Sequence, residues 1–345
     1  MRRVLLPQQF NAHALPDKGV LRQFQGQSMG TTWSVKLVQA GPCEQFQTQL
    51  QGQLDAVNAA MSHWDEASDL MRFNTAPAGA WRHLPPALFE VLSFALDVSA
   101  ASGGAYDPGA GAMVNAWGFG ARGRCDDPAF SKPSALAVQT LLVQQRALHI
   151  ELDPSLRRAC QPGGVLLDLS AVAKGYGVDR LAQYLEAHGV FHYLVEVGGE
   201  LRGAGVKPDG QPWWVALEAV AQAEGGTPTL VALHGLAVAT SGDYRRYFQQ
   251  GGQRFSHTID PRTGAPINNN IASVTVLHAQ CMAADAWSTA LTVLGLEQGL
   301  ALAERQGLAA RFLVRSGVHC GADDAITHHL TEHLTEPMRR MQDDD

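Results

Sequence analysis

The sequence predicts a globular fold of mixed helices and strands, and three stretches carry this prediction. Residues 43–61 place apolar side chains at helical spacing along one stripe. Residues 32–37 alternate polar with apolar side chains, which is typical of a strand with one buried face. Residues 167–201 have the pattern of a strand, a helix and a second strand, within the length expected of such a unit.

Composition limits the class of protein. The 345 residues allow one large domain or two interleaved lobes, and 46% hydrophobic with 17% charged residues is typical of a globular chain. A net charge of −7 argues against a nucleic-acid-binding surface. The apolar runs are far shorter than the ~20 residues of a membrane span, so we expect neither nucleic acid as a partner nor a transmembrane segment.

The two ends of the sequence suggest little structure and no export. Arg2 and Arg3 resemble the basic start of a signal peptide, but Pro7 ends the apolar run that should follow. No lipoprotein cleavage site is visible either, so we expect a cytoplasmic protein, or a periplasmic one if an export signal was removed. We expect residues 1–20 to form a flexible arm and residues 321–345 a peripheral, solvated tail.

The five cysteines are scattered, odd in number and without metal-ligand spacing. A zinc site and a disulfide framework are therefore not expected. Cys281 stands at the start of a predicted helix, where a thiol can be reactive, but a small buried residue is the favoured interpretation.

The stretch 167–201 also contains a candidate anion site. Asp168 interrupts a short apolar run, Ser170 suits the N-cap of the following helix, and Gly189 suits its C-terminal end. Lys174 lies in the first turn of that helix. Because a helix N-terminus is electropositive, a lysine beside it makes a natural site for a phosphate.

Residues 103–120 are rich in glycine, with Tyr106, Trp117 and Phe119 between the glycines. This composition suits a loop that approaches a ligand closely and stacks aromatic rings on it. A tight structural loop held by aromatic side chains is an equally good interpretation.

The remaining elements follow from the same periodicities. The expected helices are 85–103, 135–145, 281–294 and 300–305; the expected strands are 147–152, 159–164, 213–220, 229–240, 271–277 and 309–314, with a turn at 225–226 and a hairpin at 251–252.

Two further segments contain residues that could act in catalysis or metal binding. His257 lies near Asp260 beside a dense polar turn, and a histidine near a carboxylate can act as a general base, although a lone histidine is more often structural. Asp285 and Thr289 are four residues apart on one helix and therefore share a face. Oxygen ligands in that arrangement suit Mg²⁺ completed by phosphates and water; the alternative is a carboxylate that offsets the helix dipole.

Five blocks, taken together and in this order, resemble the ApbE family of FAD:protein FMN transferases. They are MGTTWSV at 29–35, MSHWDEASDLMRFN at 61–74, GAYDPGAGAMVNAWGFG at 104–120, the stretch 167–201, and the motifs SGDYRRYF, SHTIDPRTGAPI and CMAADAWSTAL within 241–291. The combination covers most of the chain and is far more specific than any single glycine motif.

The resemblance implies an α+β fold of two lobes, with mostly antiparallel sheets flanked by helices, FAD in a cleft between the lobes, and a domain over residues 21–320. It further implies Mg²⁺-dependent transfer of FMN from FAD to a Ser or Thr hydroxyl of an acceptor flavoprotein with a flavinylation motif, with release of AMP. An FAD pyrophosphatase that gives FMN and AMP, or a non-enzymatic FAD-binding protein, would share the same site.

The resemblance also implies residue roles. The FAD contacts would come from Met29, Trp64, Ala105, Tyr106, Asp107, Asp168, Lys174 and Ile259. Asp285, Thr289 and the carbonyl of Ala171 would hold Mg²⁺. Trp64 replaces the tyrosine that the family often has there. His257 is our candidate for the base that accepts the proton of the incoming hydroxyl, with Asp285 as the alternative.

Overall fold

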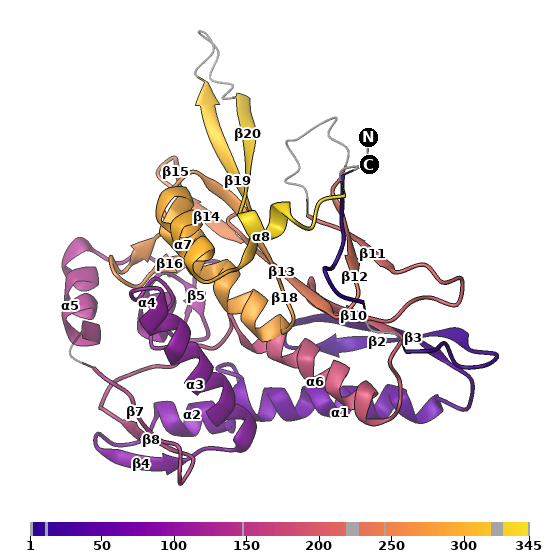
Figure 1. Ribbon diagram of the computed structural model, residues 1–345. Coiled ribbons are helices and arrows are strands. Elements are labelled where there is room, and N and C mark those ends of the chain that lie inside the picture. Colours follow the sequence, from indigo (N-terminus) through magenta and orange to yellow (C-terminus); the bar gives the residue numbers. More distant parts are fainter. Residues whose placement is uncertain are drawn as a thin grey trace. The chain divides into compact units, whose positions relative to one another are not determined.

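The computed structural model describes residues 3–10, 13–146, 148–218, 228–244, 246–318 and 327–343 (Figure 1). The chain forms two compact units, each built from separate stretches of sequence. Unit 1 comprises Met1–Leu54, Lys174–Gly242 and Asn269–Asp345, and unit 2 comprises Asp55–Ala173 and Asp243–Asn268. Helices and mostly antiparallel sheets make up both, which confirms the expected α+β class.

Unit 1 is organised around one eight-stranded sheet in which every neighbouring pair is antiparallel. Its strands, in spatial order, are β2 (Val20–Ser28), β3 (Thr31–Gln39), β9 (Tyr193–Val197), β10 (Glu200–Ala204), β13 (Leu236–Gly242), β18 (Ile271–His278), β19 (Ala309–Val318) and β20 (Thr327–Leu334). Strands distant in sequence thus become neighbours, and β10 and β13 lie side by side near the centre (Figure 1).

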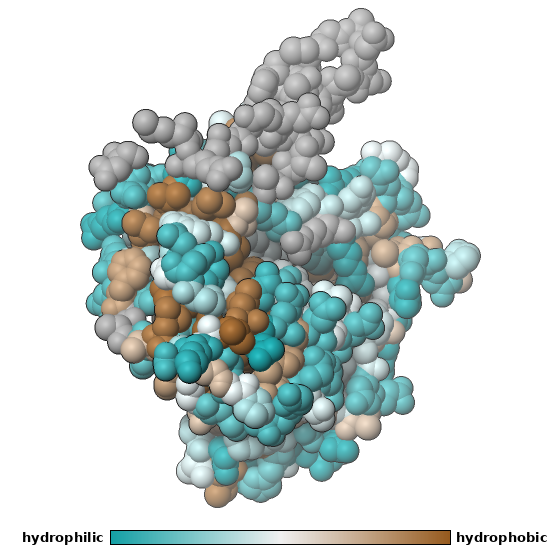
Figure 2. Space-filling view, turned by 90° about the vertical axis from the view of Figure 1, so that its right-hand side faces the viewer, coloured by the Kyte–Doolittle hydropathy of each residue, from teal (hydrophilic) through white to brown (hydrophobic). Residues whose placement is uncertain are grey.

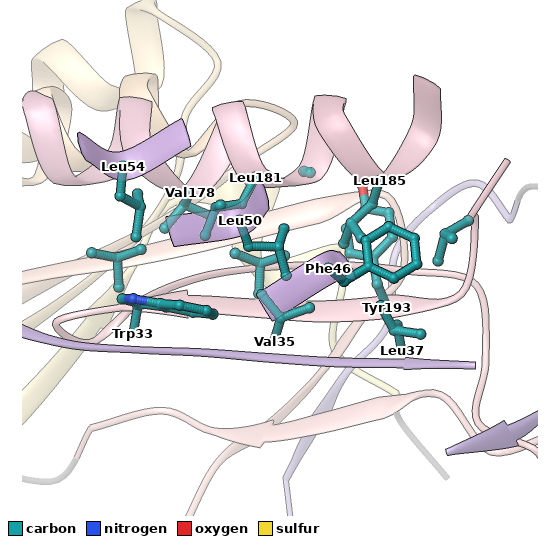
Figure 3. Close-up of a cluster of buried hydrophobic side chains, with 14 of the residues drawn as sticks. Trp33, Val35, Leu37, Phe46, Leu50, Leu54, Val178, Leu181, Leu185 and Tyr193 are labelled. Atoms are coloured by element: carbon teal, nitrogen blue, oxygen red, sulfur yellow. The ribbon is translucent and has the colours of Figure 1, made fainter. Parts of the chain in front are cut away.

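Two helices cover one face of this sheet. They are α1 (Glu44–Met61), of which residues 44–54 belong to unit 1, and α6 (Ala173–Ala187). Figure 3 shows their apolar side chains directed onto those of β3 and β9. The labelled members of this core are Trp33, Val35, Leu37, Phe46, Leu50, Leu54, Val178, Leu181, Leu185 and Tyr193. The alternation in β3 and the helical stripe in α1 therefore produce the burial that the sequence predicts.

A second hydrophobic core contains side chains of β3, β13 and β18 together with a smaller sheet. That sheet has the order β1 (Val4–Leu5), β12 (Leu230–Leu233) and β11 (Trp213–Ala216), and α8 (Glu336–Arg339) adds Met338 to the core. Leu5 is 1% exposed and Met338 is fully buried. These parts of the expected flexible arm and peripheral tail are therefore packed into unit 1, because both carry apolar side chains that complete the core. The expected turn at 225–226 lies outside the described residues.

Helix α7 (Cys281–Arg305) contacts β13 and β18 and carries Asp285 and Thr289. Its backbone departs from helical geometry at Gly295, where φ is 77° and ψ is −176°. Only glycine adopts this conformation readily, so the helix is interrupted there. The sequence prediction of two helices, 281–294 and 300–305, is in keeping with this interruption.

Unit 2 contains short helices and small antiparallel sheets. Its helices are α2 (Asp69–Asn74), α3 (Pro86–Ala101), α4 (Gly111–Ala116) and α5 (Ala135–Arg146). Its strands are β4 (Ala80–His83), β5 (Phe119–Gly120), β6 (Gly123–Arg124), β7 (Glu151–Asp153), β8 (Arg158–Gln161), β14 (Tyr247–Gln250), β15 (Gln253–Ser256), β16 (Ile259–Asp260) and β17 (Ala265–Pro266). The hairpin expected at residues 251–252 is confirmed as β14–β15.

Two predictions about unit 2 are corrected. Residues 103–120, expected to be irregular, contain α4, whose Met113 is fully buried. The apolar run before Asp168 is not a strand: Leu166 makes only an isolated bridge with Ala110. The run is apolar because Leu167 and Leu169 are buried in the core and not because it pairs within a sheet.

The burial of the cysteines predicts how readily each thiol reacts. Cys281 is fully buried, whereas Cys125 and Cys160 are partly exposed. Burial raises the pKa of the Cys281 thiol well above its ordinary value, and a protonated thiol is a poor nucleophile. We expect iodoacetamide to alkylate Cys125 and Cys160 first and Cys281 only after unfolding, as measured by peptide mass spectrometry. Equal labelling of Cys281 in the native protein would contradict this arrangement.

No helix among the described residues is long and apolar enough to cross a membrane. The face in Figure 2 shows hydrophobic residues gathered in patches among hydrophilic ones.

Candidate active site

Unit 1 brings together one ammonium group and two carboxylates. Lys174 Nζ lies 2.5 Å from Glu200 Oε1 and 3.9 Å from Asp285 Oδ1. The side chains of Glu200 and Asp285 are nearly buried, at 6% and 5% exposed, while Lys174 keeps 30% of its side chain accessible. Two negative charges therefore share one positive charge in a largely water-excluded place, where electrostatic interactions are stronger than in water.

The backbone explains how Lys174 and Glu200 meet. Strands β9 and β10 are joined by Gly198 and Gly199, whose φ values of 61° and 102° lie where other residues are strained. A side-chain carbon at Gly198 would come within 3.4 Å of Lys174 Cδ and 2.9 Å of Thr31. The tight glycine turn therefore places Glu200 at the start of β10 and leaves room for the lysine side chain.

The start of α6 differs from the sequence prediction. The helix begins at Ala173, three residues after Ser170, which is exposed and not its N-cap. Lys174 and Gly175 do lie in the first turn. The Gly175 N–H donates to Asp285 Oδ2 at 3.0 Å, so this helix start already holds a carboxylate from α7. The C-terminal signal is confirmed, because α6 ends just before Gly189, where φ is 75°.

Each group of the cluster has a displaced pKa. Burial lowers the pKa of the Lys174 ammonium, but Asp285 and Glu200 outweigh it, so that the pKa rises and the group stays charged. Burial raises the pKa of Glu200 and also that of Asp285, and the nearby ammonium opposes both shifts. Lys174 therefore supplies a fixed positive charge, and a cation bound beside Asp285 would favour the ionised form of that carboxyl group.

The hydroxyl groups of α7 follow Asp285 on the same side of the helix. Ser288 Oγ donates to the Asp285 carbonyl at 2.8 Å. Ser241 of β13 lies 2.8 Å from Ser288 Oγ and 2.9 Å from Thr289 Oγ1. Asp285 and Thr289 lie four residues apart in α7, as predicted, and a serine that sequence reasoning missed contacts the Thr289 hydroxyl.

A second buried carboxylate fixes the position of α7. Asp179 of α6 accepts hydrogen bonds from the N–H groups of Cys281 and Met282, at 3.0 and 2.9 Å, and from Arg202 at 2.8 Å. Gln280, the N-cap residue of α7, makes no side-chain cap. Asp179, which belongs to α6, instead accepts from two of the backbone N–H groups that are free at the N-terminus of α7. No local sequence signal identifies this role, because Asp179 and Cys281 are distant in sequence.

At Gly175 the backbone of α6 comes close to α7. A side-chain carbon there would lie 2.4 Å from the Cys281 carbonyl oxygen and 2.9 Å from Asp285 Cβ. We expect Gly175→Ala to destabilise the fold by about 1–3 kcal/mol, since the clash is with backbone and must move a helix. Urea denaturation followed by circular dichroism measures this.

Gly52→Ala in α1 is the matched control for Gly175→Ala. No atom lies within 4 Å of the added carbon, so this change should stabilise by about 0.5–1 kcal/mol. Equal stability of the two variants would show that α6 and α7 are not in such close contact.

Met29 is the remaining predicted FAD residue of unit 1. It occupies the turn between β2 and β3 with φ at 53°, a left-handed conformation that is uncommon outside glycine. Its Sδ would lie 3.3 Å from a side-chain carbon at Gly177 of α6. Met29 is therefore held next to the first half of the helix that carries Lys174.

In unit 2, Asp168 lines a small pocket. His63 Nδ1 is 3.7 Å from Asp168 Oδ1, and the two side chains are 16% and 9% exposed. Met71, Asn74, Asn115 and Arg122 contribute to the same pocket. The Ser170 N–H donates to Asp168 Oδ1 at 2.8 Å, which fixes the carboxylate. His63 was not singled out from the sequence, although it immediately precedes Trp64.

The other predicted FAD residues of unit 2 differ in exposure. Ala105 and Tyr106 are buried, as is Ile259 on β16, whereas Trp64 is 51% exposed. The Asp107 carboxylate accepts hydrogen bonds from Gly109 N–H at 2.7 Å and Gln145 Nε2 at 2.9 Å. Trp64 thus presents an accessible ring, while Asp107 also has a structural role.

His257 has a defined ring orientation. Its Nδ1 lies 3.0 Å from the Arg246 carbonyl oxygen, and its ring meets Phe119 edge-on at 6.3 Å. Because a carbonyl only accepts hydrogen bonds, Nδ1 is the donor, and in the neutral ring the lone pair is on Nε2. The neighbouring Asp260 carboxylate is engaged by Arg262, whose Nε and Nη2 each donate at 2.9 Å. The ring therefore has the tautomer that a base at Nε2 requires.

Comparison with known proteins identifies the family to which the chain belongs. The sequence profile of the ApbE family matches residues 29–312. The chain belongs to the ApbE family. The FAD:protein FMN transferase of Vibrio cholerae is 36% identical over 299 residues, which cover 84% of this chain and 86% of the relative. The enzyme of the same name from Salmonella typhimurium is 37% identical over 300 residues, or 85% and 84% of the two chains.

Solved structures support the ApbE fold. The apo form of the Pseudomonas stutzeri flavinyl transferase ApbE superposes with a TM-score of 0.81 at 37% identity, covering 94% of this chain and 97% of that chain. The flavin transferase ApbE from Vibrio cholerae gives the same TM-score at 32% identity, covering 94% and 99%. The ApbE assignment made from sequence blocks is therefore confirmed.

Proposed function

We propose that this chain transfers FMN from FAD to a Ser or Thr hydroxyl of an acceptor protein, with Mg²⁺ as cofactor and AMP as the second product. The observation that carries the proposal is the buried cluster of Lys174, Glu200 and Asp285, one helical turn from Thr289, in a chain of the ApbE family. The relatives named above are FAD:protein FMN transferases, and a protein acceptor is part of that name.

The reaction is a displacement at phosphorus. The hydroxyl oxygen of the acceptor forms a bond to the FMN phosphorus, the pyrophosphate P–O bond breaks, and AMP leaves with the bridging oxygen. The hydroxyl proton passes to a base. Such reactions depend mainly on positioning and on stabilising the charge of the transferring phosphoryl group.

We assign separate roles to the predicted site residues. Lys174 would bind a phosphate oxygen with its charged ammonium, which α6 and Glu200 hold in place. Met29, Trp64, Ala105, Tyr106, Asp107, Asp168 and Ile259 would bind and orient FAD. His257 Nε2 would accept the hydroxyl proton, since the Arg246 carbonyl fixes the other ring nitrogen as a donor. Asp285 is the alternative base.

The donor set fits a metal that is bound together with its substrate. No group of three or more His, Cys, Asp or Glu side chains suited to a metal occurs in the described part of the chain. Mg²⁺ commonly takes one or two carboxylates and completes its octahedron with substrate phosphates and water, which Asp285 and the Thr289 hydroxyl would allow. The Ala171 carbonyl is proposed as a further ligand. When bound, Mg²⁺ neutralises charge on the pyrophosphate.

Mass spectrometry tests the proposal directly. The protein is incubated with FAD, Mg²⁺ and an acceptor domain that carries a Ser/Thr flavinylation motif, and we expect the acceptor to gain the mass of one FMN less one water. The same domain with that residue changed to alanine is the control. AMP release without an adduct would instead favour an FAD pyrophosphatase, and FAD binding without turnover a binding protein.

A further inference from the structure

The Lys174 ammonium is held unequally between its two carboxylates. It lies 2.5 Å from Glu200 Oε1 but 3.9 Å from Asp285 Oδ1, a distance too long for a hydrogen bond. An unrestrained ammonium between two buried carboxylates would gain by bonding both of them. The asymmetry therefore needs a cause, and it lies in how the carboxylates are fixed.

Asp285 has one oxygen engaged and one directed to the cluster. The Gly175 N–H donates to Oδ2 at 3.0 Å, which fixes the carboxylate against the start of α6. Oδ1 is the oxygen that faces Lys174. A metal ion bound at Asp285 would therefore use Oδ1 as well. The Lys174 ammonium is the group that would compete with the metal ion for this oxygen.

Glu200 is held by backbone and burial. It is the first residue of β10, pairs with Val197 across the Gly198–Gly199 turn, and is 4% exposed. Its second oxygen, Oε2, is buried and has no hydrogen-bond partner among the described residues. A buried carboxylate oxygen without a partner destabilises the fold, so the ion pair with Lys174 is not explained by stability alone.

We propose that Glu200 is a positioning residue that keeps the Lys174 ammonium away from Asp285 and so leaves the Asp285 carboxylate for the metal. The inference rests on the proposed function, in which Asp285 binds Mg²⁺. Without the charge of Glu200, the ammonium of Lys174 moves to Asp285 Oδ1 and competes with the metal ion for it. The role of Glu200 is thus exerted through Lys174 and not by contact with the metal.

Direct metal binding tests this role apart from catalysis. Mn²⁺ is titrated into the full chain with saturating FAD, and free Mn²⁺ is followed by electron paramagnetic resonance after subtraction of an FAD blank. Saturation with FAD is checked for each variant by flavin fluorescence. We expect Glu200→Gln to raise the Kd for Mn²⁺ roughly tenfold or more, the range seen when a residue that supports a metal ligand is lost.

The decisive variant combines two changes. In Lys174→Gln/Glu200→Gln the competing ammonium is gone, so Mn²⁺ should bind as tightly as in Lys174→Gln alone. Glu200→Asp keeps the charge and should bind Mn²⁺ more tightly than Glu200→Gln. The matched control is Glu196→Gln on β9, whose carboxylate accepts a hydrogen bond from Ser34 Oγ at 3.1 Å and should leave the Kd unchanged. Circular dichroism confirms that each variant is folded.

Three results would overturn the role of Glu200. An unchanged Kd in Glu200→Gln, with Mn²⁺ bound by the parent chain, would show that Glu200 does not protect the site and would leave the proposed function intact. A double variant no better than Glu200→Gln would show that the effect does not pass through Lys174. Absence of Mn²⁺ binding in the parent chain would remove the metal from the proposed function and this role with it.

Discussion

Asp285→Ala is expected to lower kcat/KM for FMN transfer by about two to three orders of magnitude, the effect typical of losing one main source of charge stabilisation at a reacting centre. Asp285 is 4% exposed. Its Oδ2 accepts a hydrogen bond from the start of α6, and its Oδ1 faces Lys174. In the proposed mechanism, its loss would leave the pyrophosphate without its carboxylate-bound cation. The rate of acceptor labelling, followed by mass spectrometry at several FAD concentrations, measures the effect.

The control for Asp285→Ala is Glu297→Gln, an exposed carboxylate on the same helix, which should keep the parent rate. Circular dichroism separates loss of the site from loss of the fold. A folded Asp285→Ala variant that transfers FMN at the parent rate, with the same dependence on Mg²⁺, would contradict the proposed metal position.

Asp179→Ala is expected to have the largest effect on stability, a loss of about 3–5 kcal/mol in the free energy of unfolding. The change removes the acceptor for two N–H groups at the start of α7 and leaves Arg202 without its closest buried carboxylate. Arg202 is 18% exposed in its side chain, so little water is available to compensate. Urea denaturation followed by circular dichroism gives the magnitude.

Two further variants test the cause. Asp179→Asn still accepts hydrogen bonds at one oxygen and should lose less stability than Asp179→Ala. Asp209→Ala removes an exposed carboxylate that pairs with Lys207 at 3.5 Å and should change stability by no more than about 0.5 kcal/mol. If Asp179→Ala behaved like Asp209→Ala, the start of α7 would not depend on α6.

Much of unit 1 could be predicted from the sequence because local pattern and tertiary burial agree there. The stripe in residues 43–61 and the alternation in residues 32–37 each bury one face in the same core. Gly295 interrupts α7 in the gap between the two helices that periodicity predicts. In each case the residue types alone indicate which face of the element is buried or where the helix is interrupted.

Other features depend on contacts that local sequence does not contain. The apolar run at 165–169 has the composition of a strand, but it supplies core side chains from an irregular segment. Asp179 and Glu200 acquire their roles only when α6 meets α7 and β10. Glu200 had one usable signal, since a carboxylate directly after Gly198–Gly199 is placed by a tight turn.

The candidate site shows the same division. The spacing of Asp285 and Thr289 was enough to place them one turn apart on a helix, and both lie in α7. His257 was chosen for its closeness to Asp260, but the recorded partner of its Nδ1 is the Arg246 carbonyl. The partner that orients the ring could not be predicted from sequence proximity, because backbone carbonyls carry no sequence signal.

The division of the chain into interleaved stretches has a consequence for its synthesis. The chain passes between the units at 54/55, 173/174, 242/243 and 268/269. When Asn268 has been added at the ribosome, every residue of unit 2 exists, while the main sheet of unit 1 still lacks β18, β19 and β20. Until they emerge, β13 is an edge strand with unpaired backbone groups, which is the kind of surface that recruits chaperones or aggregates.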